Sequence, residues 1–415
     1  YINTALTDWN VPEGTVRCAG DRAFVFGGTN FHLVLELYVP VGMAAAAPSG
    51  VWVCRPAPAQ ATLKAPLRGA LVVGGATDAD VLARLETVRE AAEAGRAPDP
   101  APPAEADLRA EVRVAVDYAD ASDLAAKTAK AAQALESGNA AAWKMLRNQG
   151  VFLGRGEPHQ VAFLYTGQGS QYVNMLAGLR QTEPLVAEVF DEADRVMEPI
   201  LGRPLSDYIF ADPDDEAAMS QADEELRQTE ITQPAVLATD LALTRLLEAY
   251  GIRPDMVMGH SLGEYAALGA AGALPFADAL EAVAARGREM TAVSFDDNGL
   301  MAAVFAPLDE IQAVLDDLDG YAVIANLNSE TQAVIGGTSP AVEAAMERLT
   351  ADGHQVVQLP VSHAFHTEIV APASGPLMEV LARLDLEPPH IPIVANVSGE
   401  FYPMGPAVTP DMLEI

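Results

Sequence analysis

A single serine stands between two glycines in the stretch GHSLGEY, and this layout is typical of an activated nucleophile. The apolar run that ends at Gly259 predicts a strand, and the small residues after Gly263 predict a helix. Ser261 would then lie at the apex of a tight turn, with its hydroxyl exposed at the carboxyl edge of a sheet. A serine hydroxyl is a weak nucleophile until a base removes its proton, so this turn requires a histidine from elsewhere in the chain.

The chain has seven histidines from which this base must come. His260 adjoins the serine but would point away from it on the turn. Four others fall in linkers or at strand ends, namely His32, His159, His354 and His390. The residues alone therefore leave His363 and His366 as candidates, both in the loop SHAFHT.

A second glycine-flanked turn, TGQGSQ, follows another predicted strand and offers a place for an oxyanion. Its Gln168 would present a backbone N–H beside that of Leu262. Two convergent N–H groups form an oxyanion hole, in which each donor contributes about 3 kcal/mol to transition-state stabilisation. This pattern indicates acyl-transfer chemistry at Ser261.

Alternating apolar patterns predict the elements that position these residues. Residues 68–156 read as a small α/β unit. From Val161 to Arg288 helical and strand patterns alternate, which predicts a doubly wound sheet, and the acidic stretch 212–225 is expected to be a solvated loop. Between residues 300 and 359 the order strand, helix, strand, strand, helix, strand predicts a ferredoxin-like insert.

Composition bounds the class of protein. A chain of 415 residues that is 50% hydrophobic can bury two or three cores. The formal charge of −33 argues against nucleic acid or an anionic membrane as a partner. Cys18 and Cys54 lack metal-ligand spacing, so we expect no metal site, a reducing compartment and a cytoplasmic location. No apolar run reaches the roughly 20 residues of a membrane span, and the start at Tyr1 suggests a piece of a longer protein.

Six motifs in a fixed order resemble the malonyl-CoA:acyl carrier protein acyltransferase family of fatty acid and polyketide synthases. They are TGQGSQYVNML, TQPAVLATD, GHSLGEYAAL, ARGREM, NLNSETQAVIGG and SHAFHT. The resemblance covers residues 161–415 and implies an α/β-hydrolase-like acyltransferase core with a ferredoxin-like insert at about 298–361, truncated at its C-terminal end. Residues 1–40 resemble the C-terminal tail of a ketosynthase, and residues 41–160 resemble the small α/β linker domain between ketosynthase and acyltransferase. The segments GGTNFH and AWKMLRNQGVFLG are similar in sequence to segments of polyunsaturated fatty acid synthases and related iterative polyketide synthases.

The resemblance implies a ping-pong reaction without a permanently bound cofactor. Ser261 would attack malonyl-CoA, His366 would act as general base, and the N–H groups of Gln168 and Leu262 would hold the oxyanion. The phosphopantetheine thiol of an acyl carrier protein would then accept the malonyl group. The expected partners are this carrier protein, in the same polypeptide or assembly, and a ketosynthase domain through which the chain would form a homodimer.

Further residues match substrate-binding positions of the family. Arg286 would grip the free carboxylate of malonate with its planar, permanently charged fork. Phe365 would exclude an added methyl group, a discrimination of about 1–3 kcal/mol. Three other residues would line the pocket, namely Gln233, Asn328 and His260. The group that orients His366 is expected beyond Ile415, and Asn396 is left unassigned.

Two other functions share some of these features. A serine hydrolase such as a thioesterase has the same turn, but it uses water as acceptor and needs no arginine beside the nucleophile. A catalytically idle scaffold domain would have no reason to keep the serine, the histidine and the arginine together. Capture of a stable malonyl ester on Ser261 distinguishes transfer from both.

Overall fold

The computed structural model describes residues 17–24, 30–37, 63–157, 159–404 and 408–413. In the N-terminal unit, β1 (Arg17–Phe24) and β2 (Asn30–Leu37) pair as antiparallel strands. Part of GGTNFH and residues 41–62 of the expected linker, with Cys54, lie outside the described residues.

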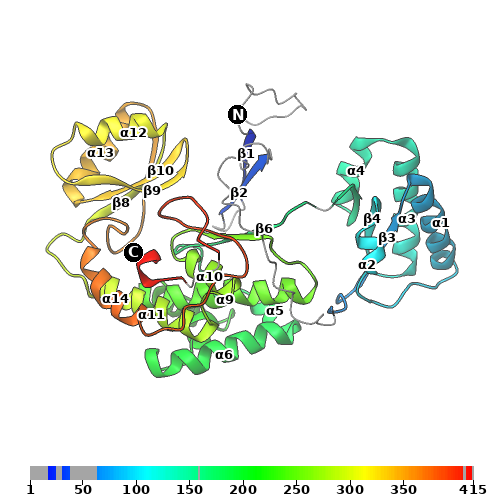
Figure 1. The fold of residues 1–415 in the computed structure, drawn as a ribbon, viewed down its shortest axis with the longest axis horizontal. Coiled ribbons are helices and arrows are strands. Elements are labelled where there is room, and N and C mark those ends of the chain that lie inside the picture. The colour runs from blue at the N-terminus through cyan, green and yellow to red at the C-terminus, as the bar shows by residue number, and fades with distance from the viewer. Residues whose placement is uncertain (1–16, 25–29, 38–62, 158, 405–407, 414–415) are drawn as a thin grey trace. The chain divides into compact units, whose positions relative to one another are not determined.

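Residues 63–157 contain an antiparallel sheet with helices packed on it (Figure 1). The strands run in the order β3 (Gly69–Gly75), β4 (Val112–Tyr118) and β5 (Val151–Arg155). The helices are α1 (Asp78–Glu93), α2 (Glu105–Leu108), α3 (Ala121–Ser137) and α4 (Ala140–Arg147). Every second residue of β4 is buried, which is why this strand forms the centre of the unit's own hydrophobic core.

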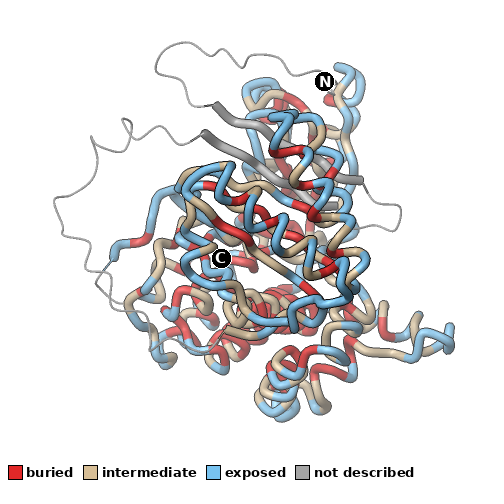
Figure 2. The backbone as a smooth tube through the Cα atoms, turned by 90° about the vertical axis from the view of Figure 1, so that its right-hand side faces the viewer, coloured by how far each residue is buried: buried red, intermediate tan, exposed pale blue. Residues whose placement is uncertain are grey.

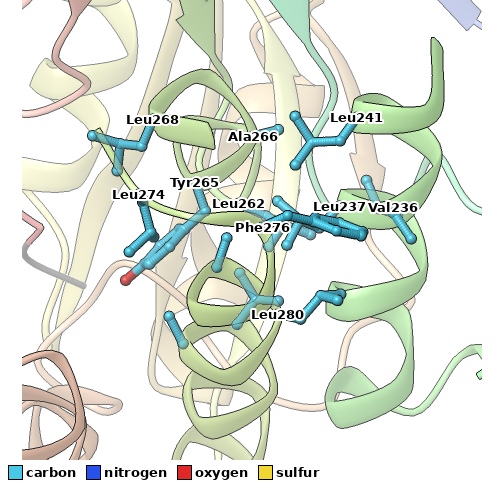
Figure 3. Packing of buried hydrophobic residues seen from close by; sticks show 14 of the residues in the cluster. Val236, Leu237, Leu241, Leu262, Tyr265, Ala266, Leu268, Leu274, Phe276 and Leu280 are labelled. Carbon is cyan, nitrogen blue, oxygen red and sulfur yellow. The ribbon is translucent and has the colours of Figure 1, made fainter. Parts of the chain in front are cut away.

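The part that carries Ser261 is built on a three-stranded parallel sheet. Its order is β12 (Ile393–Val394), β7 (Met256–Gly259) and β6 (Ala162–Tyr165). The main helices around its core are α6 (Pro184–Leu201), α9 (Thr229–Ala249), α10 (Gly263–Ala270), α11 (Phe276–Ala292) and α14 (Ser374–Leu381). Figure 3 shows side chains of α9, α10 and α11 meeting in this core, with Leu237, Leu262 and Leu280 among them. Helices with one buried face appear in Figure 2 as alternating buried and exposed stretches.

The alternation of strands and helices expected between residues 161 and 288 is present only in a coarse form, as β6, a run of helices, β7 and then α10 and α11. No strand lies between β6 and β7 in the described chain; this segment holds α5 (Ala177–Thr182), α6, α7 (Ser206–Ile209), α8 (Glu216–Leu226) and α9. Buried residues of α6 recur every three or four positions, at Val186, Val189, Phe190, Ala193 and Met197. That spacing is the period of a helix, and it outweighs the β-branched composition.

The acidic stretch 212–225 is also not a plain loop, because most of it lies in α8. The Asp215 side chain caps this helix by accepting hydrogen bonds from the N–H groups of Ala217 and Ala218. Ala222 and Leu226 are buried beneath it, while the acidic side chains face outward. A cap and two buried positions are sufficient to order a segment that composition alone assigns to solvent.

Residues 300–358 follow the order of elements that the sequence predicts. They form β8 (Leu300–Phe305), α12 (Leu308–Asp316), β9 (Ala322–Ser329), β10 (Gln332–Gly337), α13 (Ser339–Ala351) and β11 (Gln355–Gln358). The four strands pair antiparallel in the order β11-β8-β10-β9 and enclose a separate hydrophobic cluster. Two short 3-10 helices, η2 (Ala371–Ala373) and η3 (Pro410–Met412), complete the described elements.

The described residues lack two features that would indicate particular classes of function. None of their helices is long and apolar enough to cross a lipid bilayer. The same residues contain no group of three or more side chains arranged to hold a metal ion.

Candidate active site

Ser261 lies on the tight turn between β7 and α10, and two glycines make that turn possible. A Cβ atom on Gly259 would stand 1.9 Å from the carbonyl carbon of Gly263. A Cβ atom on Gly263 would stand 2.5 Å from the backbone oxygen of Tyr165 on the neighbouring strand. Ser261 itself has a φ of 52°, a left-handed backbone conformation that a serine adopts only where its surroundings enforce it.

His366 is the histidine that reaches the serine. Its Nε2 lies 2.7 Å from the Ser261 Oγ, and its backbone is also left-handed, with a φ of 58°. His363 is buried and its Nε2 lies 2.8 Å from the Val293 carbonyl oxygen, so that nitrogen donates to the backbone and is not available to Ser261. Of the two candidates that the sequence leaves, the geometry therefore selects His366.

The environment of His366 keeps its imidazole neutral. Burial is the main cause that lowers its pKa to about 4, and electrostatic interactions with Arg286 and His260 add to the effect. A neutral ring at pH 7 can accept the Ser261 proton on Nε2. Its Nδ1 makes no hydrogen bond to any of the described residues.

The backbone around the turn leaves one donor free. The N–H groups of His260, Gly263, Glu264 and Tyr265 bond to backbone carbonyls, and that of Ser261 bonds to the Asn396 side chain. Within residues 260–265, only the Leu262 N–H has no acceptor in the described chain. A Cβ on Gly167 would lie 2.7 Å from the His260 carbonyl oxygen, so the turn that carries Gln168 is in contact with the turn that carries Ser261.

Arg286 is a buried cation without a counter-ion. It lies on α11 with 5% of its surface exposed, and no carboxylate of the described chain is within ion-pair distance of its guanidinium. Burial lowers its pKa, while the nearby Tyr265 and Glu264 act in the opposite direction. Arg288, two residues along the same helix, is exposed and pairs with Glu289 at 2.9 Å.

The remaining residues predicted from the sequence have different surroundings. Phe365 is buried in a cluster with Met290 and Val293. His260 Nε2 and Asn328 Oδ1 are 3.0 Å apart on the exposed side of the turn. Gln233 is fully buried, its Oε1 has no hydrogen-bond partner, and its Nε2 lies 3.8 Å from the Met290 sulfur.

Asn396 has a part in the site that sequence reasoning missed. Its Oδ1 accepts the Ser261 N–H at 3.2 Å and its Nδ2 donates to the Gly259 carbonyl at 2.8 Å, so one side chain joins both arms of the turn. The same Nδ2 is 2.6 Å from Glu264 Oε2. An asparagine directly after a strand that pairs parallel with β7 is the signal that was available, because such strand ends share one edge of a sheet.

Comparison with known sequences gives a family. The model of the acyl transferase domain family matches residues 162–406. The malonyl CoA-acyl carrier protein transacylase of Bacillus subtilis is 39% identical over 247 residues, which cover 58% of this chain and 74% of the relative. The mycoketide-CoA synthase of Mycobacterium tuberculosis is 38% identical over 242 residues, but these span only 6% of that much longer protein.

Solved structures agree with this result. The malonyl-CoA:acyl carrier protein transacylase of Xanthomonas oryzae has a TM-score of 0.55 and 37% identity, covering 62% of this chain and 79% of that one. A malonyl-transacylase solved in complex with its type II acyl-carrier protein has a TM-score of 0.53 and 32% identity, covering 59% of this chain and 76% of its own.

Proposed function

Because this chain belongs to the acyl transferase domain family, we propose that it transfers a malonyl group from malonyl-CoA to an acyl carrier protein. The observation that carries the proposal is the unpaired guanidinium of Arg286, buried close enough to His366 for its charge to depress the pKa of that imidazole. A buried cation costs free energy unless an anion compensates it. The free carboxylate of a malonyl group is such an anion, and it would arrive with the substrate.

The reaction proceeds in two balanced half-reactions. Nε2 of His366 takes the Ser261 proton while Oγ attacks the thioester carbonyl, and the developing oxyanion is held by the N–H groups of Leu262 and Gln168. Collapse breaks the carbon–sulfur bond, and the imidazolium returns its proton to the CoA thiolate. A carrier phosphopantetheine thiol then gives its proton to His366 and attacks the carbonyl of the malonyl-serine ester. The bond between the carbonyl carbon and Oγ breaks, and the imidazolium returns its proton to Ser261 Oγ, which restores both residues.

Two residues would set the selectivity for the acyl group, one at the malonyl carboxylate and one beside the α-carbon. The Arg286 fork binds the malonyl carboxylate in a bidentate manner, which an acetyl group cannot satisfy. Phe365 stands where an α-methyl group would need space, so methylmalonyl-CoA is disfavoured by about 1–3 kcal/mol. We further assign His260 and Asn328, which form an exposed pair, and the fully buried Gln233 to the lining of the substrate pocket; their contact and burial are compatible with that role.

The wider protein is proposed from the relatives. We assign residues 1–40 to a ketosynthase tail, 41–160 to a linker domain and 161–415 to the acyltransferase, with residues 298–361 as a ferredoxin-like insert. The setting is a polyketide or polyunsaturated fatty acid synthase that forms a homodimer through its ketosynthase.

The charge of the chain bears on how the carrier protein is delivered. A chain with a charge of −33 repels an acidic carrier protein, so tethering at an effective concentration of ~mM would support transfer. Added salt is expected to accelerate transfer to a free carrier by screening this repulsion.

The test is incubation with isotope-labelled malonyl-CoA followed by intact-protein and peptide mass spectrometry. A malonyl adduct on the peptide that contains Ser261 is expected, with discharge when a phosphopantetheinylated carrier protein is added. Ser261→Ala removes the adduct. Rapid release of free malonate without a trapped ester would establish a hydrolase instead, and absence of any adduct or malonate would establish an idle scaffold.

A further inference from the structure

Glu264 places a second charge close to Arg286, and its carboxylate is held by three donors. Asn396 Nδ2 lies 2.6 Å from Oε2, the Asn396 N–H lies 3.2 Å from Oε1, and the Tyr402 hydroxyl lies 2.6 Å from Oε1. Glu264 belongs to the first turn of α10, whereas Asn396 and Tyr402 belong to the chain that follows β12. Three hydrogen bonds from a different segment therefore fix the direction of this side chain.

Glu264 and Arg286 interact electrostatically without forming an ion pair. The Arg286 charge lowers the pKa of the Glu264 carboxyl, against a larger increase caused by burial, and the Glu264 charge raises the pKa of Arg286. Their charged atoms are nevertheless not within ion-pair distance. Opposite charges attract strongly in a poorly solvated interior, so a mobile glutamate side chain here would turn toward the guanidinium.

We propose that Asn396 and Tyr402 are positioning residues that hold the Glu264 carboxylate away from Arg286, so that the guanidinium stays free for the carboxylate of the substrate. This inference rests on the proposed malonyl transfer. Without the two holding residues, Glu264 would occupy the place of the substrate carboxylate and act as an intramolecular competitor. With Asn396 and Tyr402 in place, the negative charge of Glu264 still offsets part of the free-energy cost of burying Arg286.

The size of the effect follows from competition between two states. A substrate that binds only the open state has its apparent affinity reduced by the fraction of molecules in that state. If loss of one donor lets Glu264 pair with Arg286 in about nine molecules of ten, the KM for malonyl-CoA rises about tenfold. The turnover of bound substrate changes little, because substrate that has displaced Glu264 meets the same Ser261 and His366.

Tyr402→Phe is the sharpest variant, because it removes one Glu264 donor and leaves the bonds between Asn396 and the Ser261 turn in place. We expect a KM for malonyl-CoA raised about five- to tenfold, an almost unchanged kcat, and no change in the KM for acetyl-CoA, which has no free carboxylate. The double variant Tyr402→Phe/Glu264→Gln is expected to restore the KM for malonyl-CoA. Tyr118→Phe is the matched control, since its hydroxyl bonds the Pro98 carbonyl at 2.8 Å in the unit of residues 63–157.

Three results would overturn the inference: an unchanged KM for malonyl-CoA, an equal rise for both thioesters, or no rescue by Glu264→Gln. If Tyr402→Phe does not fold, Asn396→Asp tests the same idea, because a second carboxylate beside Glu264 repels it toward Arg286 while Oδ1 still accepts the Ser261 N–H. Its KM for malonyl-CoA should rise and should fall again with Glu264→Gln. Failure of the wild-type chain to accept malonyl would refute the proposed function itself, which is a different outcome.

Discussion

Replacing Arg286 by methionine tests the central claim with two opposite effects. Arg286 is 5% exposed and its guanidinium is unpaired within the described chain, so its contribution should appear only when a carboxylate is bound. Two charge-assisted hydrogen bonds at about 1.5–3 kcal/mol each amount to roughly 3–5 kcal/mol once the cost of desolvating the carboxylate is included. Arg286→Met is therefore expected to lower kcat/KM for malonyl-CoA by roughly 10²- to 10⁴-fold.

The same substitution should stabilise the fold. An apolar side chain of similar length removes a buried charge that Glu264 offsets only in part, so the free energy of unfolding should rise by about 1–4 kcal/mol. Urea denaturation measures this change in the free energy of unfolding. Steady-state acylation with malonyl-CoA and acetyl-CoA measures the loss in kcat/KM. Loss of activity together with gain of stability is characteristic of a site that is strained for function.

Arg288→Met is the matched control on the same helix. Arg288 is exposed and pairs with Glu289 on the surface, so its replacement should change the free energy of unfolding by no more than about 1 kcal/mol and leave kcat/KM unchanged. The reasoning would be refuted if Arg286→Met slowed acetyl-CoA and malonyl-CoA equally. A loss for malonyl-CoA of less than about tenfold would refute it as well.

Three further predictions concern the pKa values and the turn. The pKa of His366 is about 4, so stopped-flow acylation should be constant from about pH 6 to 8 and fall tenfold per pH unit below about 4. A bound carboxylate offsets the Arg286 charge, so the acidic limb of kcat should lie at higher pH than that of kcat/KM, and coincident limbs would contradict this account. Burial raises the pKa of Asp240 to about 8. Between about pH 4 and 8 the folded chain therefore binds more protons than the unfolded chain, and the free energy of unfolding falls as the pH rises through that window. In urea denaturation Asp240→Asn should match wild type near pH 4 and be about 2–4 kcal/mol more stable near pH 7, whereas a pH-independent difference would rule out a protonated carboxyl. Gly259→Ala should cost about 3 kcal/mol or more and abolish acylation, because its Cβ would meet the Gly263 backbone at 1.9 Å, while Gly178→Ala, with no atom within 4 Å of its Cβ, should be tolerated in both assays.

Several elements could be predicted because their signals are local. Alternating burial along Val112–Tyr118 and the strand and helix patterns between residues 300 and 358 are readable from neighbouring residues. The five helices between β6 and β7 were harder to predict from the sequence. The apolar runs in that segment fit the period of a helix and that of a strand until the buried positions are known. The acidic helix α8 was missed because its cap and its two buried residues matter more than its average charge.

The candidate site divides in the same way. The sequence by itself placed Ser261 on a glycine-flanked turn, put a second glycine turn at Gln168, and supplied an arginine in a motif of a known family. It did so because a tight turn restricts its residues through contacts with their immediate neighbours in the chain. Family resemblance then favoured His366, which the residues alone had not separated from His363.

Only the tertiary structure decided which groups meet. His366 approaches Ser261 across 105 positions of the chain, and Asn396 reaches the same turn across 135. The isolation of Arg286 and the three bonds that restrain Glu264 are likewise properties of packing, since they depend on where every nearby carboxylate and donor is directed. Sequence patterns encode backbone geometry over a few residues, whereas the burial, charge and distance that give these side chains their chemistry arise when distant segments pack together.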